Sequence, residues 1–333
     1  MYYKHIELME TAIVSVAMAT YNGEKYLREQ LDSLYAQTRK PDEIVVSDDN
    51  STDGTTKILE EYRVKYGLKY EVNSKSLGVN KNFEKAIRAC KGNYVMICDQ
   101  DDIWLPDKIE QTLNYMHNME SVHGTDSPIL ITSEAESFVK PEEVILTTKP
   151  CLGTITDYKD FLFNTTQYCQ GCTMMMNRQL LDKVPSFPDS FKVYPYDAHI
   201  SVVSILLAHK CHILQPMMYY RHHDNNVVAK LGIPSRKERI YERIAEMTYS
   251  FFDIPYLRQD YYRKMVTGYN IEIENKEVKK DIDAIVKFAT SYYWGKIKAI
   301  LSVSSIDKKR RWKQLISTTL TYPLRLFFSV PKI

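Results

Sequence analysis

The chain has 333 residues, of which 44% are hydrophobic and 26% charged, and 44 basic against 42 acidic residues give a formal net charge of +2. This composition is typical of a folded soluble protein with a sizeable core, in one large domain or two. The near-zero net charge argues against a dedicated nucleic-acid binder. No run of about 18 apolar residues occurs, so we predict no membrane-spanning helix.

The first 120 residues alternate short apolar runs, typical of buried strands, with amphipathic helices. The predicted strands are 12–19, 43–47, 69–73 and 94–98, and the predicted helices are 24–37, 55–66, 80–90 and 103–116. This alternation indicates an α/β protein with a parallel sheet. Ligands of such sheets bind beyond the carboxyl ends of the strands, where polar stretches follow three of the predicted strands here.

The rest of the chain is less regular up to residue 230, with an extended run at 127–138 and a predicted helix at 197–210. From about residue 235 the pattern is helical, so we predict a first domain at 1–230 and a helical C-terminal domain at 231–333. Residues 290–333 carry nine Lys or Arg and one acid, interleaved with Trp and Phe. This segment is either the solvated face of a packed helical domain or a surface that lies on anionic lipid.

The chain has six cysteines whose spacing is not that of a disulfide scaffold: Cys90, Cys98, Cys151, Cys169, Cys172 and Cys211. Cys169 and Cys172 form a single C-x-x-C, and no second pair completes a zinc site. We predict that these side chains are buried thiols of a protein in a reducing cytoplasm.

Three acids, Asp99, Asp101 and Asp102, directly follow the apolar run "YVMIC". Two carboxylates separated by one residue point the same way from an extended strand, so Asp99 and Asp101 are expected to converge. A divalent cation such as Mg²⁺ or Mn²⁺, held together with the phosphates of a ligand, would balance their repulsion. Alternatively, Asp102 caps the following helix, with Pro106 in its first turn, which explains only one of the acids.

A second acidic stretch, "SDDNSTDG", contains Asp48 and Asp49 at the end of the second predicted strand. A turn and helix cap explain Ser51, Thr52 and Gly54, and leave one carboxylate free at the strand tip for a ribose or base. The sequence has neither G-x-G-x-x-G nor a Walker A motif, which excludes a dinucleotide or P-loop type of phosphate grip.

Taken in order, the motifs of residues 12–230 resemble those of the inverting family 2 glycosyltransferases, which have a GT-A fold. They are "VSVAMATYNGEKYLREQLDSLYAQT", "PDEIVVSDDNSTDGT", "LGVNKNF", "GNYVMICDQDDIWLPDKI", "QGCTMMMNRQLL" and "YRHHDNNVV". The pair "DQDDIW" and "YRHHDNN" resembles the bacterial rhamnosyltransferases of cell-wall and capsular polysaccharide assembly.

The resemblance implies a Rossmann-like sheet with helices on both faces, followed by a helical C-terminal region. It also implies Mg²⁺ or Mn²⁺ as cofactor, dTDP-rhamnose or a UDP-sugar as donor, and a lipid-linked saccharide acceptor at the inner face of the cytoplasmic membrane. In that setting, residues 290–333 would contact the membrane peripherally.

The resemblance assigns contacts with the nucleotide diphosphate to seven residues: Thr20, Tyr21, Asn22, Asp48, Asp49, Lys81 and Asp99. It makes Asp101 a metal ligand and puts His223 close to the metal, although a lone histidine can also be purely structural. Asp102 and Gly171 match the acceptor side. Ala19 stands where the family usually has the proline of "P-x-Y-N" in its first loop.

Inverting transfer needs a carboxylate that takes the proton of the acceptor hydroxyl. By resemblance this base is Asp197, in "YPYDAHISVV", although Asp197 could also be a plain N-cap. The tryptophans of the rhamnosyl motif "HDWW" are absent, so the resemblance supports the acid itself and not the acceptor-side contacts. Two other functions remain open at this stage: a nucleotidyltransferase, or a non-catalytic module that binds a glycan or a partner. The oligomeric state, monomer or homodimer, is also open.

Overall fold

The computed structural model describes residues 13–140, 143–144, 169–187, 189, 195–223, 276 and 279–280. All of these except three lysines of the C-terminal half belong to one compact unit of the chain. The predictions for a helical domain at 231–333, for the basic segment 290–333 and for Cys151 fall on residues outside the described ones and stay predictions.

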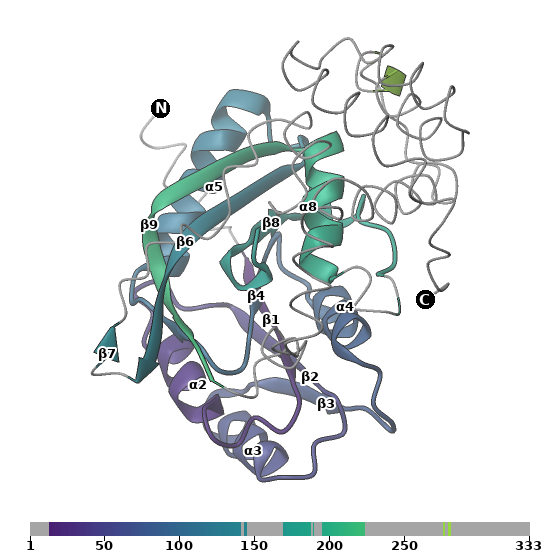
Figure 1. The fold of residues 1–333 in the computed structure, drawn as a ribbon. Helices are drawn as coiled ribbons and strands as arrows, with labels where there is room; N and C mark the ends of the chain where they lie inside the picture. The colour runs from purple at the N-terminus through teal and green to yellow at the C-terminus, as the bar shows by residue number, and fades with distance from the viewer. Residues whose placement is uncertain are drawn as a thin grey trace, which may run out of the picture. The chain divides into compact units, whose positions relative to one another are not determined.

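The first half of the sheet is parallel, as predicted. Its strand order is β3-β2-β1-β4 (Figure 1), and the strands are β1 (Val14–Thr20), β2 (Glu43–Asp48), β3 (Lys69–Val72) and β4 (Tyr94–Cys98). β1, β2 and β4 are almost entirely buried, which agrees with their continuous apolar runs.

The sheet then continues into a part that the sequence does not reveal. The additional strands are β5 (Ile103–Trp104), β6 (Ile129–Lys140), β7 (Glu143–Val144), β8 (Met175–Asn177) and β9 (His209–Arg221). β8 pairs antiparallel with β4, and β6 pairs with both β8 and β9, which gives a nine-stranded mixed sheet. The segment expected to be irregular therefore extends the sheet.

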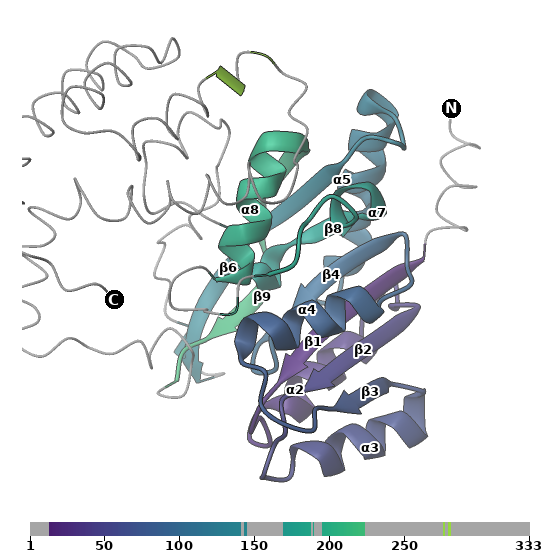
Figure 2. The ribbon, with the colours of Figure 1, turned by 90° about the vertical axis from the view of Figure 1, so that its right-hand side faces the viewer.

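Helices cover both faces of the sheet, as the resemblance implies. They are α2 (Leu27–Tyr35), α3 (Thr55–Tyr66), α4 (Val79–Ala89), α5 (Lys108–His123), α7 (Arg178–Leu181) and α8 (Tyr196–Leu207), with a 3₁₀ turn η1 (Gly171–Thr173). α4 and α8 lie on one face, and α2, α3 and α5 on the other (Figure 2). α3 ends at Tyr66, and its C-cap Gly67 has a left-handed φ of 76°, which suits glycine.

Two predicted helix boundaries are wrong. The helix expected at 103–116 begins only at Lys108, because Ile103 and Trp104 pair with β9 as strand β5. Asp107 is its N-cap, so the alternative in which Asp102 caps this helix is also wrong. The helix expected at 197–210 ends at Leu207, since the chain turns into β9 two residues later.

The core lies between the sheet and its helices. Met174, Met175 and Met176 are 0% exposed and belong to this core. Of the predicted buried thiols, Cys90, Cys98, Cys169 and Cys172 are buried, and Cys211 is half-buried. Among the described helices, none combines the length and apolar character needed to cross a membrane.

Candidate active site

The loops after β1, β2 and β4 meet at one edge of the sheet. Thr20 and Asp48, the last residues of β1 and β2, are register partners, and Met18 of β1 is paired with Cys98, the last residue of β4. The carboxyl ends of these parallel strands therefore bring together the polar stretches that the sequence places after them.

Direct hydrogen bonds connect these loops. The Gln100 side chain accepts from the Tyr21 backbone N–H at 2.9 Å and donates to the Tyr21 carbonyl at 3.1 Å. A Cβ at Gly23 would lie 2.2 Å from Gln100 Oε1, so a larger residue there would displace the Gln100 amide from these hydrogen bonds. Asn22 N–H donates to Ser51 Oγ at 2.9 Å, which ties the first loop to the second.

Of the predicted nucleotide contacts Thr20, Tyr21 and Asn22, the last two are exposed, and Tyr21 has 51% of its surface accessible. Thr20 is buried, and its hydroxyl donates to Asp48 Oδ2 at 2.7 Å. Asn22 has a φ of 48°, and its Oδ1 accepts from Thr52 N–H at 2.8 Å. Asparagine tolerates this left-handed conformation better than most residues, which explains its presence at the bend.

The expectation of a free carboxylate at the tip of β2 is wrong. Asp48 is 0% exposed, and besides Thr20 it accepts from the backbone N–H and the hydroxyl of Ser51 at 2.9 and 2.6 Å. Asp49 accepts four hydrogen bonds, from Ser76 Oγ, Leu77 N, Gly78 N and Asn73 Nδ2. Asp49 thus fixes the turn that leads into α4. A nucleotide contact of either acid stays a prediction.

Lys81, predicted to meet the diphosphate, lies in the first turn of α4. Its Nζ is 2.9 Å from Glu84 Oε2 and 3.0 Å from Ser186 Oγ. The side chain is 28% exposed, and its contact with the diphosphate stays a prediction.

Residues 99–102, called the acid loop below, leave the sheet after Cys98 and bend. The extended geometry expected for Asp99 and Asp101 is therefore wrong, yet the bend still gathers the acids. Ligand atoms of Asp99, Asp102 and Cys172 lie within 4.8 Å of one another.

Repulsion among these acids is visible in their proton affinities. Burial, and next the charge of Asp101, raises the pKa of Asp99 to about 7. Burial, followed by the charges of Asp101 and Asp99, raises the pKa of Asp102 well above its usual range. The positive charge of the nearby Lys108 offsets these effects only in part.

One atom of the acid loop points to a bound cation. Asp102 is 0% exposed; its Oδ1 accepts from the Arg221 backbone N–H at 3.0 Å, whereas its Oδ2 has no hydrogen-bond partner within the described part of the chain. A buried carboxylate oxygen without a partner is costly, and oxygen atoms are the ligands that Mg²⁺ and Mn²⁺ prefer. The acid loop therefore fits a divalent cation. The contact of Asp102 with the acceptor sugar stays a prediction.

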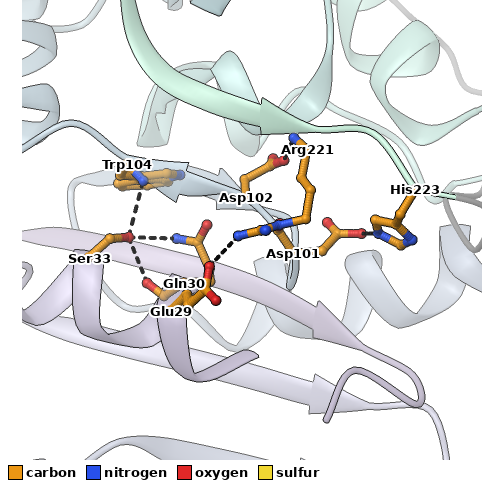
Figure 3. Close-up of polar contacts among 8 residues, drawn as sticks. All are labelled: Glu29, Gln30, Ser33, Asp101, Asp102, Trp104, Arg221 and His223. Atoms are coloured by element: carbon orange, nitrogen blue, oxygen red, sulfur yellow. Dashed lines mark hydrogen bonds and ion pairs between the residues drawn. The ribbon is translucent and has the colours of Figure 1, made fainter. Parts of the chain in front are cut away.

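The structure brings the two predicted metal-binding residues together. His223 Nε2 lies 2.7 Å from Asp101 Oδ2 (Figure 3), and the His223 ring packs against Tyr26 at 4.7 Å between ring centroids. The two atoms are hydrogen-bonded to each other in this structure, and an imidazole nitrogen and a carboxylate oxygen are both ligand types for divalent cations. Metal binding by the pair stays a prediction.

A buried lysine, which the sequence does not reveal, lies near the acid loop. Lys108 is 1% exposed; its Nζ donates to the Cys172 carbonyl at 2.7 Å and lies 3.9 Å from the centroid of the Trp104 ring. Burial lowers its pKa to about 8. In sequence, Lys108 looks like an ordinary residue in the first turn of a helix, so no pattern marks it.

The predicted base, Asp197, is the second residue of α8. Pro195 is the N-cap of this helix, so the N-cap alternative for Asp197 is wrong. Burial raises the Asp197 pKa to about 7, although backbone N–H groups of Ala198 and Gly171 bind its carboxylate. A carboxylate that titrates near neutral pH is suited to general-base catalysis.

Gly171, expected on the acceptor side, also supports this base. A Cβ at Gly171 would lie 2.2 Å from the Tyr196 hydroxyl, so the η1 turn and the start of α8 touch closely. Tyr196 is stacked on Phe83 at 4.1 Å between centroids, and its N–H donates to Asn80 Oδ1 at 2.9 Å. The position of Asp197 is thus fixed from several elements. An acceptor contact of Gly171 is not tested.

Comparison with known proteins agrees with this geometry. The family described as glycosyl transferase family 2 matches residues 15–185. The dTDP-rhamnosyl transferase RfbG of Shigella flexneri is 29% identical over 265 residues, which are 75% of this chain and 82% of that protein. An uncharacterized protein of Mycobacterium tuberculosis is 27% identical over 219 residues, 64% of this chain; the chain spans only 60% of the length of that relative.

Among solved structures, residues 1–349 of S. aureus TarS in complex with UDP match with a TM-score of 0.52 and 17% identity, over 96% of this chain and 94% of that one. This likeness concerns the fold and confirms the expected GT-A architecture. Since the family match covers more than half of the residues, the chain belongs to glycosyl transferase family 2.

Proposed function

We propose that the protein transfers a sugar from a nucleoside diphosphate sugar to an acceptor hydroxyl, with inversion at the anomeric carbon. One observation carries this proposal: the acid loop, which fits a divalent cation, and the Asp197 carboxylate, which has a pKa of about 7, lie at the same edge of the sheet. They are close enough that the charge of Asp197 contributes to the raised pKa of Asp99. Membership of the family supports the same reaction.

Different residues have different roles in this reaction. Asp197 takes the proton of the acceptor hydroxyl while that oxygen forms a bond to the anomeric carbon. The bond from this carbon to the diphosphate oxygen breaks, and the nucleoside diphosphate leaves with the electron pair. Asp101 and His223 would hold a divalent cation, Mg²⁺ or Mn²⁺, which when bound stabilises the negative charge of the departing diphosphate.

On the donor side, Tyr21 offers an exposed ring beside the loops that follow β1 and β2. Asp99 directly follows β4, and the family resemblance assigns it a contact with the ribose. The donor we propose is dTDP-rhamnose, because RfbG, a relative at 29% identity, is named a dTDP-rhamnosyl transferase. A UDP-sugar is the alternative, since TarS was solved with UDP and with UDP-GlcNAc.

The acceptor we propose is a lipid-linked saccharide at the inner face of the cytoplasmic membrane, in the synthesis of a bacterial surface polysaccharide. The basic and aromatic composition of residues 290–333 supports a peripheral contact with anionic lipid. Contact with the lipid surface would keep the enzyme close to a membrane-bound substrate.

The test is a transfer assay with a panel of nucleotide sugars and lipid-linked saccharides in the presence of Mn²⁺. We expect release of nucleoside diphosphate together with a glycan extended by one sugar, and dTDP-rhamnose as the best donor. The variant Asp197→Asn should bind the donor as the parent does and form no product. Formation of pyrophosphate would indicate a nucleotidyltransferase instead, and donor binding without turnover in the parent would indicate a binding module.

A further inference from the structure

Arg221, the last residue of β9, is buried beside the acid loop and has no role in the reaction described so far. It is 3% exposed, and it stands two residues before His223. Figure 3 shows its side chain reaching across the acid loop towards α2.

Two hydrogen bonds connect Arg221 to the acid loop. Its backbone N–H donates to Asp102 Oδ1 at 3.0 Å, and its Nε donates to the Asp101 carbonyl at 2.7 Å. Neither bond uses a carboxylate oxygen of Asp101, so that carboxylate stays directed towards His223. Arg221 therefore fixes the backbone that carries Asp101 without consuming its metal-binding group.

The guanidinium is itself fixed from the other side. It forms an ion pair with Glu29 of α2. Its central carbon lies 4.5 Å from the centroid of the Tyr26 ring and 4.5 Å from that of Phe138, so the planar group is enclosed between two aromatic side chains. The Tyr26 ring also packs against His223. One arginine thus links α2, the acid loop and the segment that carries His223.

A planar guanidinium suits this position for a physical reason. Its several N–H donors have fixed directions and its faces stack on aromatic rings, so one side chain can satisfy Asp101, Glu29 and both rings at once. A lysine has a single ammonium group and cannot reproduce this set of contacts. The contacts of a metal ligand with the residues behind it commonly decide its affinity for the metal.

We infer that Arg221 is a positioning residue that holds the Asp101 carboxylate and the His223 imidazole in register for one divalent cation. It is not itself a ligand. This inference rests on the proposed function, because the cation it concerns is the one proposed to bind the donor's diphosphate. It predicts that replacing Arg221 weakens metal binding even where the variant stays folded.

The test is Mn²⁺ binding by the full-length protein, followed by the electron paramagnetic resonance signal of the free ion, for the parent, Arg221→Gln and Arg221→Lys. We expect the dissociation constant for Mn²⁺ to rise about 10- to 100-fold in Arg221→Gln. Arg221→Lys should recover only part of this loss. A matched control is Arg28→Gln, which removes another arginine–glutamate pair of α2, between Arg28 and Glu61, at 2.5 Å on the surface. It should leave Mn²⁺ binding unchanged.

The variant Asp101→Ala separates failure of this inference from failure of the proposed function. If Asp101→Ala loses Mn²⁺ and Arg221→Gln binds it as tightly as the parent, the inference is overturned and the proposed function stands. If the parent itself binds no Mn²⁺ with or without nucleoside diphosphate, both fail. Should Arg221→Gln not fold, Glu29→Gln removes only the ion pair; a several-fold weaker Mn²⁺ affinity supports the inference, and an unchanged affinity overturns it.

Discussion

At the scale of single residues, burial rather than residue type decides what the acids can do. Asp48 and Asp49 are buried and saturated with hydrogen bonds, so they stabilise loops. Asp102 is buried with one oxygen left over, which favours a cation. Asp197 is half-buried with a pKa of about 7, which makes it ready to accept a proton. The four aspartates thus differ in what they do: two stabilise loops, one favours a cation and one can accept a proton.

The raised pKa of Asp197 predicts the pH dependence of transfer. The base works only as a carboxylate, so kcat/KM should increase with pH through about 7 and level off above it. The measurement is the pH profile of kcat/KM with the preferred donor. A rate that stays constant from about pH 6 to pH 8 would contradict the role of Asp197 as the base.

The same pKa predicts an effect on stability. The folded protein binds this proton more tightly than the unfolded chain, so stability from this group is lost as the pH rises from the ordinary Asp value of 3.8 to about 7. Asp197→Asn avoids the buried charge and should raise the free energy of unfolding by about 1–3 kcal/mol at pH 8. Urea denaturation should show little difference between the variant and the parent near pH 4; a variant less stable at pH 8 would contradict this account.

Sequence could predict some members of the site and not others, for a simple reason. Asp101 and Asp197 belong to short motifs that can be read locally. Lys108, Gln100 and Arg221 act through partners 64, 79 and 120 residues away in the chain, and no local pattern contains those distances. The free carboxylate expected at β2 was wrong for the same reason, because donors from another loop occupy Asp49.

At the scale of elements, the η1 turn and α8 form one unit that positions the base. The backbone of Gly171 binds the Asp197 carboxylate, and the Tyr196 ring lies where a side chain at residue 171 would be. Because Tyr196 also packs on Phe83, it has little freedom to move away. The turn and the helix should therefore respond together to a change at residue 171.

Gly171→Ala tests this coupling. The added methyl group should displace Tyr196 and with it Asp197, so kcat should fall at least about 10-fold and stability by about 1–3 kcal/mol, while nucleotide affinity is retained. Gly67→Ala is the matched control: its φ of 76° makes alanine unfavourable, but the residue lies at the end of α3. It should lower stability without changing kcat. The account fails if Gly171→Ala keeps the parent's kcat.

The elements themselves were predictable where their apolar pattern is continuous. β1, β2 and β4 are buried apolar runs, and the helices between them follow a helical period, so the parallel half of the sheet follows from sequence. β5 has two residues and β8 three, too short for any period. β9 mixes exposed and buried residues and contains Pro216, and its pairing with β6 shifts register, so its pattern is irregular.

At the scale of the whole molecule, the chain combines a candidate active site at the sheet edge with a basic C-terminal segment. The site draws on residues between 20 and 223, and the segment 290–333 is proposed to contact lipid. The two functions should therefore be separable by mutation.

Charge removal in the C-terminal segment tests the lipid proposal in the full-length protein. Changing Lys308, Lys309, Arg310 and Arg311 to Gln should weaken binding to vesicles with anionic lipid, by up to about 1 kcal/mol per charge, and leave nucleotide affinity unchanged. Sedimentation with anionic and with neutral vesicles measures this. Equal binding of variant and parent to anionic vesicles would contradict a membrane contact through these residues.

The central claim is that the acid loop binds the donor's diphosphate through a divalent cation. Calorimetric titration with the nucleoside diphosphate, in Mn²⁺ and in EDTA, tests it most directly in the parent and in Asp101→Ala. The account predicts tight binding by the parent in Mn²⁺, and at least about 10-fold weaker binding in EDTA or in the variant. Nucleotide binding that is equally tight in all of these conditions would contradict it.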